Sequence, residues 1–289
     1  MRRWWPNALL AAVVAALAAW VYFKPAPVGP VEHPLAALEP STVESIVIER
    51  PGEPTIAAQK KQDAWFVTAP VTARSNETRI QQVLEIAKAR SVHRYPAADL
   101  ARFELAEPQA RLTLGKQSFS FGMVSPVTRE QYVLAGDAVY AVSPRYGAAL
   151  PASAADLASL RLLGPAEVPV RFETGTFSVA QRDGSWRLEP AGGELSQDDF
   201  VRWVDAWRHA TAVRVELHGT VKPSADDMKI KLKDGREIVL AVLSRAPEVT
   251  LVRADEKLNY QFRGAVAQRL LAPPGATTSK PPMNADERR

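Results

Sequence analysis

Four histidines are the first residues to test as metal ligands or proton-transfer groups. A zinc site needs ligands that converge on one ion, and histidines within one element then follow short spacings such as HxH or HxxxH. The histidines of this chain stand far apart and match neither spacing: His33, His93, His209 and His218. The chain also contains no cysteine, which excludes thiolate metal sites, thiol nucleophiles and disulfides. We therefore predict no metal site and no cofactor.

Two pairs of adjacent acids are the next candidates, because paired carboxylates transfer protons or bind metal ions. Asp198-Asp199 falls at the expected start of a helix, where acids are stabilising, and Asp226-Asp227 falls in an expected turn. We interpret both pairs as capping or solvated groups. Ser75 and Ser196 precede helical patterns and are predicted caps rather than nucleophiles. The sequence has no GxSxG, SxxK or phosphate-binding glycine loop, so we predict no catalytic residue and no enzyme.

Aromatic residues offer a third kind of site. Trp203 and Trp207 lie one helical turn apart, so they either stack on a ligand or pack in the core, and core packing is the expectation. Tyr132, Tyr140 and Tyr260 fall on expected strands, where they either mark a recognition surface or are partly buried. These alternatives leave the binding residues of the chain unknown.

The charge balance excludes one class of partner. The chain has 36 Lys and Arg against 32 Asp and Glu, a net charge of +4, and the two signs are interspersed. A nucleic-acid-binding protein shows a basic stripe and aromatic platforms instead. We therefore predict no nucleic-acid partner. The apolar fraction of 46% is typical of a globular protein with a packed core.

The N-terminal segment predicts where the chain is located. Residues 8–23 form an uncharged apolar run, preceded by Arg2 and Arg3 and followed by Lys24. A helix over this run reaches about 27 Å, close to the thickness of a bilayer core. The positive-inside rule then keeps residues 1–7 in the cytoplasm. We expect a single-pass anchor in a bacterial inner membrane, with the remaining chain in the periplasm.

Two alternatives to the anchor stay open. A cleaved signal peptide also has a basic start and an apolar run, but this run ends in large residues without a small-x-small cleavage site. A buried helix of a soluble protein is the other alternative. Residues 24–40 contain five prolines and predict a semi-rigid linker that holds the folded part away from the bilayer.

The rest of the chain repeats itself at a distance of about 120 residues. Each copy begins with a tryptophan strand that ends at a proline, Trp65 to Pro70 and Trp186 to Pro190. A helical pattern follows, and then alternating strands joined by tight turns such as Asp234-Gly235. The predicted buried helix faces are Ile80, Val83, Leu84 and Ala87 in the first copy and Phe200, Trp203, Val204 and Trp207 in the second.

These patterns predict the α+β class, with a tandem repeat of a β-hairpin–helix–antiparallel-meander unit after one N-terminal transmembrane helix. We expect the first repeat at residues 41–162 and the second at 163–272. The tail at 273–289 is rich in proline, serine and charge, and is predicted to be disordered.

The strand and turn motifs also carry a resemblance. They comprise the Trp65 strand with its terminal Pro70, the helix after Ser75, and the sequence FELAEP at 103–108 leading into LTLG at 112–115. The strand pair at Tyr132 and Tyr140 belongs to them too. Over about residues 40–270 the chain resembles a bacterial family known only as domain of unknown function 4340. Members usually have Gly-Leu where this chain has Glu104-Leu105, a small departure in a turn.

The resemblance implies a membrane-anchored extracytoplasmic module. Many such proteins are encoded beside ABC-transporter subunits, including relatives of gliding-motility transporter components, and the family supplies no catalytic residue. We therefore expect a binding or scaffold protein, an accessory subunit of an ABC-transporter-like or other envelope complex with a protein partner such as a transporter permease. Two alternatives remain: a cell-envelope enzyme that acts on glycan or lipid through carboxylates brought together by folding, and a small-molecule or lipid-binding module with its site between the two copies.

Overall fold

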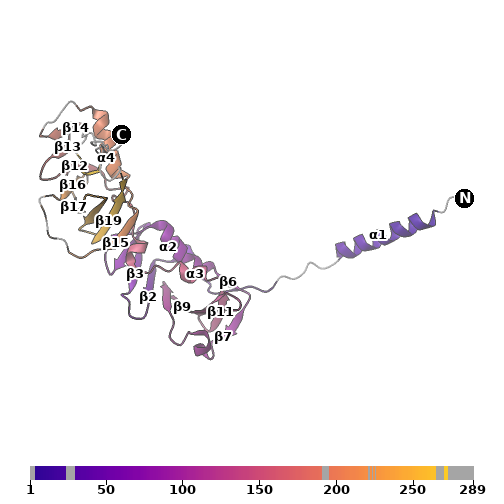
Figure 1. Ribbon diagram of the computed structural model, residues 1–289. Helices are drawn as coiled ribbons and strands as arrows, with labels where there is room; N and C mark the ends of the chain where they lie inside the picture. The colour runs from indigo at the N-terminus through magenta and orange to yellow at the C-terminus, as the bar shows by residue number, and fades with distance from the viewer. Residues whose placement is uncertain are drawn as a thin grey trace, which may run out of the picture.

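The computed structural model describes residues 4–23, 30–190, 195–220, 222, 224, 226–264 and 270–272 (Figure 1). The fold mixes α and β structure, with two large sheets, few helices and antiparallel pairing in each strand pair of the described residues. This confirms the predicted α+β class. The predicted tail at 273–289 lies outside the described residues.

The N-terminal helix α1 covers Trp5–Phe23 and is built from alanine, leucine and valine, of which alanine and leucine are strong helix formers. Its large apolar side chains are exposed, for example Leu9 and Val21. Among the described residues, no helix has both the length and the apolar character that crossing a membrane requires. The span expected at residues 8–23 stays a prediction.

The first large sheet has nine strands in the order β5-β4-β3-β2-β8-β9-β10-β11-β7. Alternating sequence produces these strands: in β8 the side chains of Ala110, Leu112 and Leu114 are buried, and that of Arg111, between the first two, is exposed. The strands are β2 Ser45–Glu49, β3 Ile56–Lys61, β4 Ala64–Ala69, β5 Ala73–Arg74, β7 Arg94–Pro96, β8 Ala110–Leu114, β9 Gln117–Val124, β10 Gln131–Ala135 and β11 Ala138–Val142.

Helix α2 (Glu77–Leu84) continues into the 3-10 helix η2 (Glu85–Lys88). The predicted apolar face is confirmed, since Ile80, Val83, Leu84 and Ala87 are all buried. The predicted cap is wrong. Asn76 caps the helix, because its side chain accepts hydrogen bonds from the backbone N–H groups of Thr78 and Arg79, whereas Ser75 Oγ donates to the carbonyl oxygen of Trp65 at 2.7 Å.

The second large sheet has eight strands in the order β14-β13-β12-β16-β17-β18-β19-β15. Helix α4 (Gln197–Arg208) begins at the predicted cap Ser196, whose hydroxyl accepts from the backbone N–H of Asp199 while the Asp199 carboxylate accepts from the backbone N–H of Ser196. The strands are β12 Pro169–Glu173, β13 Ser178–Arg182, β14 Ser185–Glu189, β15 Arg214–Leu217, β16 Met228–Leu232, β17 Glu237–Ser244, β18 Glu248–Arg253 and β19 Leu258–Arg263.

The two sheets have corresponding strand orders. In each, three consecutive strands form one meander, four later strands form another, and a strand that precedes the second meander in sequence lies at its far edge: β7 in the first sheet and β15 in the second. The predicted β-hairpin at the start of each unit is therefore a three-stranded meander, because β2, β3 and β4 all pair in series. Among the described residues of the two large sheets, β5 has no counterpart; residues 191–194, which follow β14, lie outside the described residues.

The shorter elements join these parts. Strands β1 (His33–Pro34) and β6 (Arg90–Ser91) pair with each other, and Leu35 is buried. The end of the expected linker at residues 24–40 thus packs on the folded region, while residues 24–29 lie outside the described residues. Further helical turns are η1 Pro40–Thr42, η3 Leu100–Phe103, α3 Arg145–Ala148 and η4 Ala154–Leu157.

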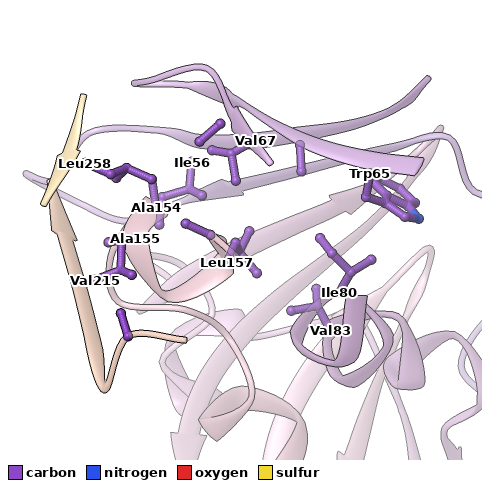
Figure 2. Packing of buried hydrophobic residues seen from close by; sticks show 14 of the residues in the cluster. Ile56, Trp65, Val67, Ile80, Val83, Ala154, Ala155, Leu157, Val215 and Leu258 are labelled. Atoms are coloured by element: carbon purple, nitrogen blue, oxygen red, sulfur yellow. The ribbon is translucent and has the colours of Figure 1, made fainter. Parts of the chain in front are cut away.

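The two halves meet along the segment 157–162, which hydrogen-bonds to both. On one side the Asn76 backbone N–H donates to Leu157 O at 2.7 Å, and Ser159 N–H donates to Arg74 O at 2.8 Å. On the other side the N–H of Leu162 donates to Ala210 O at 3.0 Å. Buried side chains continue the contact (Figure 2): Ala154, Ala155 and Leu157 of η4 lie between Ile56, Val67, Ile80 and Val83 of the first half and Val215 and Leu258 of the second. The halves therefore share one apolar core.

Candidate functional site

A pocket of about 540 Å³ lies at this meeting of the two halves. Its wall combines the ends of β4 and β5, the segment 159–167, and the β16–β17 and β18–β19 turns. The charged residues that line it are Arg74, Glu77, Arg161, Glu167, Arg236, Arg253, Asp255 and Glu256. We call this cavity the junction pocket.

A buried arginine forms one side of the junction pocket. Arg253 ends strand β18 and has 1% of its surface exposed, because the alternation of the strand turns it inward beside Val249 and Leu251. Its two terminal nitrogens donate to Glu167, with Nη1 2.8 Å from Oε2 and Nη2 2.6 Å from Oε1. Its Nε and Nη2 also donate to Asp255, each at 2.9 Å. Such a two-pronged pair is the strongest geometry for a guanidinium and a carboxylate.

A second arginine connects the halves. Arg74 is the last residue of β5, and its Nε donates to Glu256 Oε1 at 2.6 Å, across 182 residues of sequence. Its Nη2 donates to the carbonyl oxygens of Arg161 and Leu162, both at 3.0 Å. The hydroxyl of Tyr260, which is fully buried, donates to Glu256 Oε2 at 2.5 Å. Arg74 thus bonds to the segment between the halves and to the second sheet at once.

The protonation states follow from these contacts. Burial by itself would raise the pKa of Glu167, but the hydrogen bonds and charge of Arg253, with the N–H of Gly164, lower that pKa to about 2. Burial also raises the pKa of Tyr260, and the charge of Glu256 raises it further. Burial opposes the charge of Arg253, whose pKa is nevertheless raised by its bonds to Glu167 and Asp255. Glu167 is therefore a carboxylate at neutral pH, and Tyr260 is a neutral hydrogen-bond donor.

The two buried acids of this arrangement, Glu167 and Glu256, are held as partners of the arginines. A general acid or base must exchange a proton near neutral pH, and Glu167 cannot, because its pKa is about 2. Its oxygens accept three hydrogen bonds, two from Arg253 and one from the backbone N–H of Gly164. The charged groups of the junction pocket that face solvent lie at its edge: Glu77, Arg161, Arg236 and Asp255.

The residues proposed from sequence lie mostly elsewhere. The histidines are dispersed: His33 on β1, His93 beside β7, His209 at the end of α4, with Nδ1 2.9 Å from Asp205 O, and His218 after β15. Within the described part of the chain, no group of three or more His, Asp or Glu side chains is placed to hold a metal ion. Asp199 caps α4, and the buried Asp227 accepts the N–H of Ser224 in the turn before β16.

The aromatic candidates belong to the core. Trp203 and Trp207 pack against Phe172 of β12, with ring centroids 4.7 and 5.6 Å away. Tyr140 is buried and Tyr132 is partly buried beside Phe103. Core packing is thus confirmed over ligand stacking for the two tryptophans. Of the three candidate tyrosines, Tyr260 contacts Arg74 and Glu256 of the junction pocket.

Four central residues of the site were not predicted from the sequence: Arg74, Glu167, Arg253 and Glu256. The sequence nevertheless contains one local signal of a buried charge. In the sequence EVTLVR of β18, Arg253 occupies the same alternating face as Val249 and Leu251, so an arginine at a core-facing position predicts a buried acidic partner. The identity of that partner could not be read, because Glu167 lies 86 residues away.

Comparison with known proteins identifies one family. The family model described as a domain of unknown function, DUF4340, matches residues 65–213. This range is narrower than the 40–270 expected from the sequence; it contains Arg74, Arg161 and Glu167, and ends before Arg253. No curated protein and no solved structure matches the chain.

Proposed function

Because the chain belongs to the family of DUF4340 domains, we propose that it is a membrane-anchored extracytoplasmic binding or scaffold protein, without enzymatic activity. Its role in this proposal is that of an accessory subunit in an ABC-transporter-like or other envelope complex of a bacterial inner membrane. The protein partner is a transporter permease or another envelope subunit. The N-terminus stays in the cytoplasm and the two sheets lie in the periplasm.

The observation that carries the proposal is the exposed apolar surface of α1. Leu9 is 69% exposed, Val14 is 59% exposed and Val21 is 74% exposed. Apolar side chains in such a continuous run are unfavourable in water, so a helix of this kind needs a lipid or protein cover. Arg2 and Arg3 before the run, with only Lys24 close behind it, support the proposed orientation.

The body supports a scaffold in which two copies of one unit are held together. The strand orders of the two sheets correspond position by position, apart from β5, and this supports the proposed tandem repeat. The shared core at η4 and the bond from Arg74 to Glu256 join the copies. A joined pair of sheets presents its outer edge strands in a fixed relation, as a binding scaffold requires.

The arginine pairing of the pocket acids disfavours the enzyme alternative. A glycan- or lipid-cleaving enzyme needs one carboxyl that donates a proton and another that accepts one or attacks. Glu167 and Glu256 do come together in the junction pocket, but Glu167 is ion-paired with the buried Arg253 and Glu256 with the partly buried Arg74.

Two measurements, one on spheroplasts and one on isolated membranes, test the location. Protease added to intact spheroplasts is expected to degrade the body and leave a short N-terminal fragment, and alkaline carbonate is expected to leave the chain in the membrane fraction. A variant with Val14→Arg and Leu17→Arg should move to the soluble fraction, because charges at the centre of a span are costly. A body untouched by external protease, or a mature chain that lacks α1, would refute the anchored location.

Cross-linking in native membranes tests the accessory role. The full chain, purified after cross-linking, is expected to retain a transporter or envelope subunit. The matched control is α1 with its linker fused to an unrelated periplasmic domain, which removes both sheets and keeps the anchor. Equal recovery of the same subunits with the control, or none with the full chain, would count against the scaffold role.

A further inference from the structure

In the junction pocket, the central hydrogen-bond acceptors have partners, whereas some donors at the edge have none among the described residues. The acceptors are occupied: Glu167 accepts from Arg253 and Gly164, and Glu256 accepts from Arg74 and Tyr260. Asp255 accepts from Arg253 as well. The central carboxylates therefore have little capacity left for a further donor.

Two arginines at the edge of the pocket have unused donors. The exposed side chain of Arg161 makes no hydrogen bond or ion pair with the described residues. Arg236 uses its Nε for Asp234 at 2.8 Å, and its Nη1 lies 3.8 Å from Glu167 Oε1. Its side chain is 58% exposed, and its Nη2 has no partner in the described part of the chain. The edge also carries two exposed acids: Glu77 accepts from Gln81 Nε2 at 3.2 Å, and Asp255 accepts from Arg253. The donors left without a hydrogen-bond partner among the described residues are those of the two arginines, which favours a ligand with an anionic acceptor.

An apolar wall stands beside these donors. Phe66 of β4 is half-buried and pairs with Arg74 across the β4–β5 ladder, so the two side chains share one face of the sheet. Ala64 lies on the same face, two residues away, and Pro165 and Ala166 line another part of the pocket. The pocket thus offers apolar contact next to unused positive charge, the combination typical of small-molecule sites between domains.

We propose that the junction pocket binds a small amphipathic anion. Its carboxylate or phosphate accepts hydrogen bonds from Arg161 and Arg236, and its apolar body lies against Phe66. A volume of about 540 Å³ is within the range for ligands of drug-like size. The planar guanidinium forks of the two arginines suit either acid group. This site goes beyond the scaffold role and does not depend on where the chain is located.

One ligand chemistry has two sources, a soluble organic acid and the headgroup of an acidic lipid. Three probes separate the requirement for a negative charge from the requirement for an apolar body. Each is titrated calorimetrically into the full chain in an uncharged detergent. 2-Naphthoate supplies an apolar body with a carboxylate, 2-naphthamide supplies the same body without charge, and dihexanoyl phosphatidate supplies a phosphate on short acyl chains.

The test variant replaces both edge arginines, Arg161→Gln with Arg236→Gln. Its matched control replaces two exposed arginines outside the pocket, Arg182→Gln with Arg263→Gln, which form surface ion pairs with Glu189 and Glu248. All four side chains are exposed, so both variants are expected to unfold at the temperature of the unchanged protein. Partition of the probes into the detergent is the same for all variants and therefore cancels in their comparison.

We expect 2-naphthoate or phosphatidate to bind the unchanged chain and the control at least about tenfold more tightly than the test variant, because each charge-assisted pair contributes substantially to binding. Binding of naphthoate alone supports a soluble acid, and binding of phosphatidate alone supports a lipid headgroup. The inference is overturned if neither anion binds, if 2-naphthamide binds as tightly as 2-naphthoate, or if the test variant keeps the affinity of the control.

Discussion

Replacing the buried carboxylate of the junction by its neutral isostere, Glu167→Gln, should destabilise the folded body. The side chain of Glu167 is 6% exposed and shares two hydrogen bonds with Arg253, whose side chain is 2% exposed. Glutamine keeps the volume but removes the charge, so Arg253 retains only Asp255 and the more distant Glu256 as counter-charges. A buried ion pair that loses one partner leaves the other uncompensated.

The magnitude follows from the pKa. The ordinary value for this carboxyl is 4.5, and the folded protein holds it at about 2. At about 1.4 kcal/mol per pH unit, the folded state favours the ionised over the neutral form by about 3 kcal/mol as an upper bound. Solvent at the pocket mouth screens part of this interaction, so we expect the glutamine variant to lose about 2 to 3 kcal/mol at pH 7.

The pH dependence gives the sharper test. Because the folded-state pKa of Glu167 is depressed, its contribution is complete above about pH 4.5 and is lost as the pH falls towards 2. The difference between the unchanged chain and Glu167→Gln should thus be constant from pH 7 to 5 and shrink below 4.5. Urea unfolding of the full chain, followed by tryptophan fluorescence, measures it.

A matched control lies on β12. Glu173 forms a surface ion pair with Arg171, with side chains 46% and 41% exposed, and Glu173→Gln is expected to change the unfolding free energy by less than about 0.5 kcal/mol. If Glu167→Gln costs no more than this control, or if its cost is the same at pH 4 as at pH 7, the buried ion pair is not what holds the junction.

Three further substitutions test the core, the cap and the buried hydroxyl. Trp207→Ala should cost about 3 to 5 kcal/mol in urea unfolding, because it empties a fully buried site, while Val201→Ala on the exposed face of α4 should cost less than about 1 kcal/mol; equal costs would contradict the assigned helix face. Ser196→Ala should lower the unfolding free energy by about 1 kcal/mol, since it removes the cap of α4; an unchanged value would place the cap elsewhere. Tyr260→Phe should cost about 1 to 3 kcal/mol, because Glu256 loses a buried donor, and a stabilised variant in thermal unfolding would refute that role.

Most of the strands could be predicted because their information is local. In β8 and β16 the buried side chains follow the alternation of the sequence, with every second residue buried. The apolar face of α4 was equally readable from its spacing. Errors arose where neighbouring residues compete for one role, as at α2, where Asn76 caps the helix and Ser75 bonds back to the preceding strand.

The junction could not be predicted in the same way, because its pairs are not local. Arg74 and Glu256 are 182 positions apart, and nothing within a turn of either residue specifies the other. Each one looks like an ordinary surface charge beside a strand end. Only the inward position of Arg253 on β18 carries a local signal, and that signal reports a buried charge without naming its partner.

A comparison of the two sheets shows where this site lies in the fold. The hairpin β10–β11 and the hairpin β18–β19 occupy corresponding places in the strand orders. In the first, the buried Ala135 ends β10 and two residues connect the strands; in the second, Arg253 ends β18 and four residues connect them, among them Asp255 and Glu256. These charges thus occur where the second sheet departs from the first.

The same holds for the other side of the pocket. Strand β5, which supplies Arg74, is the one strand of the first large sheet without a counterpart in the described part of the second. The contact between an arginine of the first half and acids of the second joins the halves and also leaves a cavity lined by both. The places where the two sheets differ, rather than the strands that correspond, are therefore where a function specific to this chain should be sought.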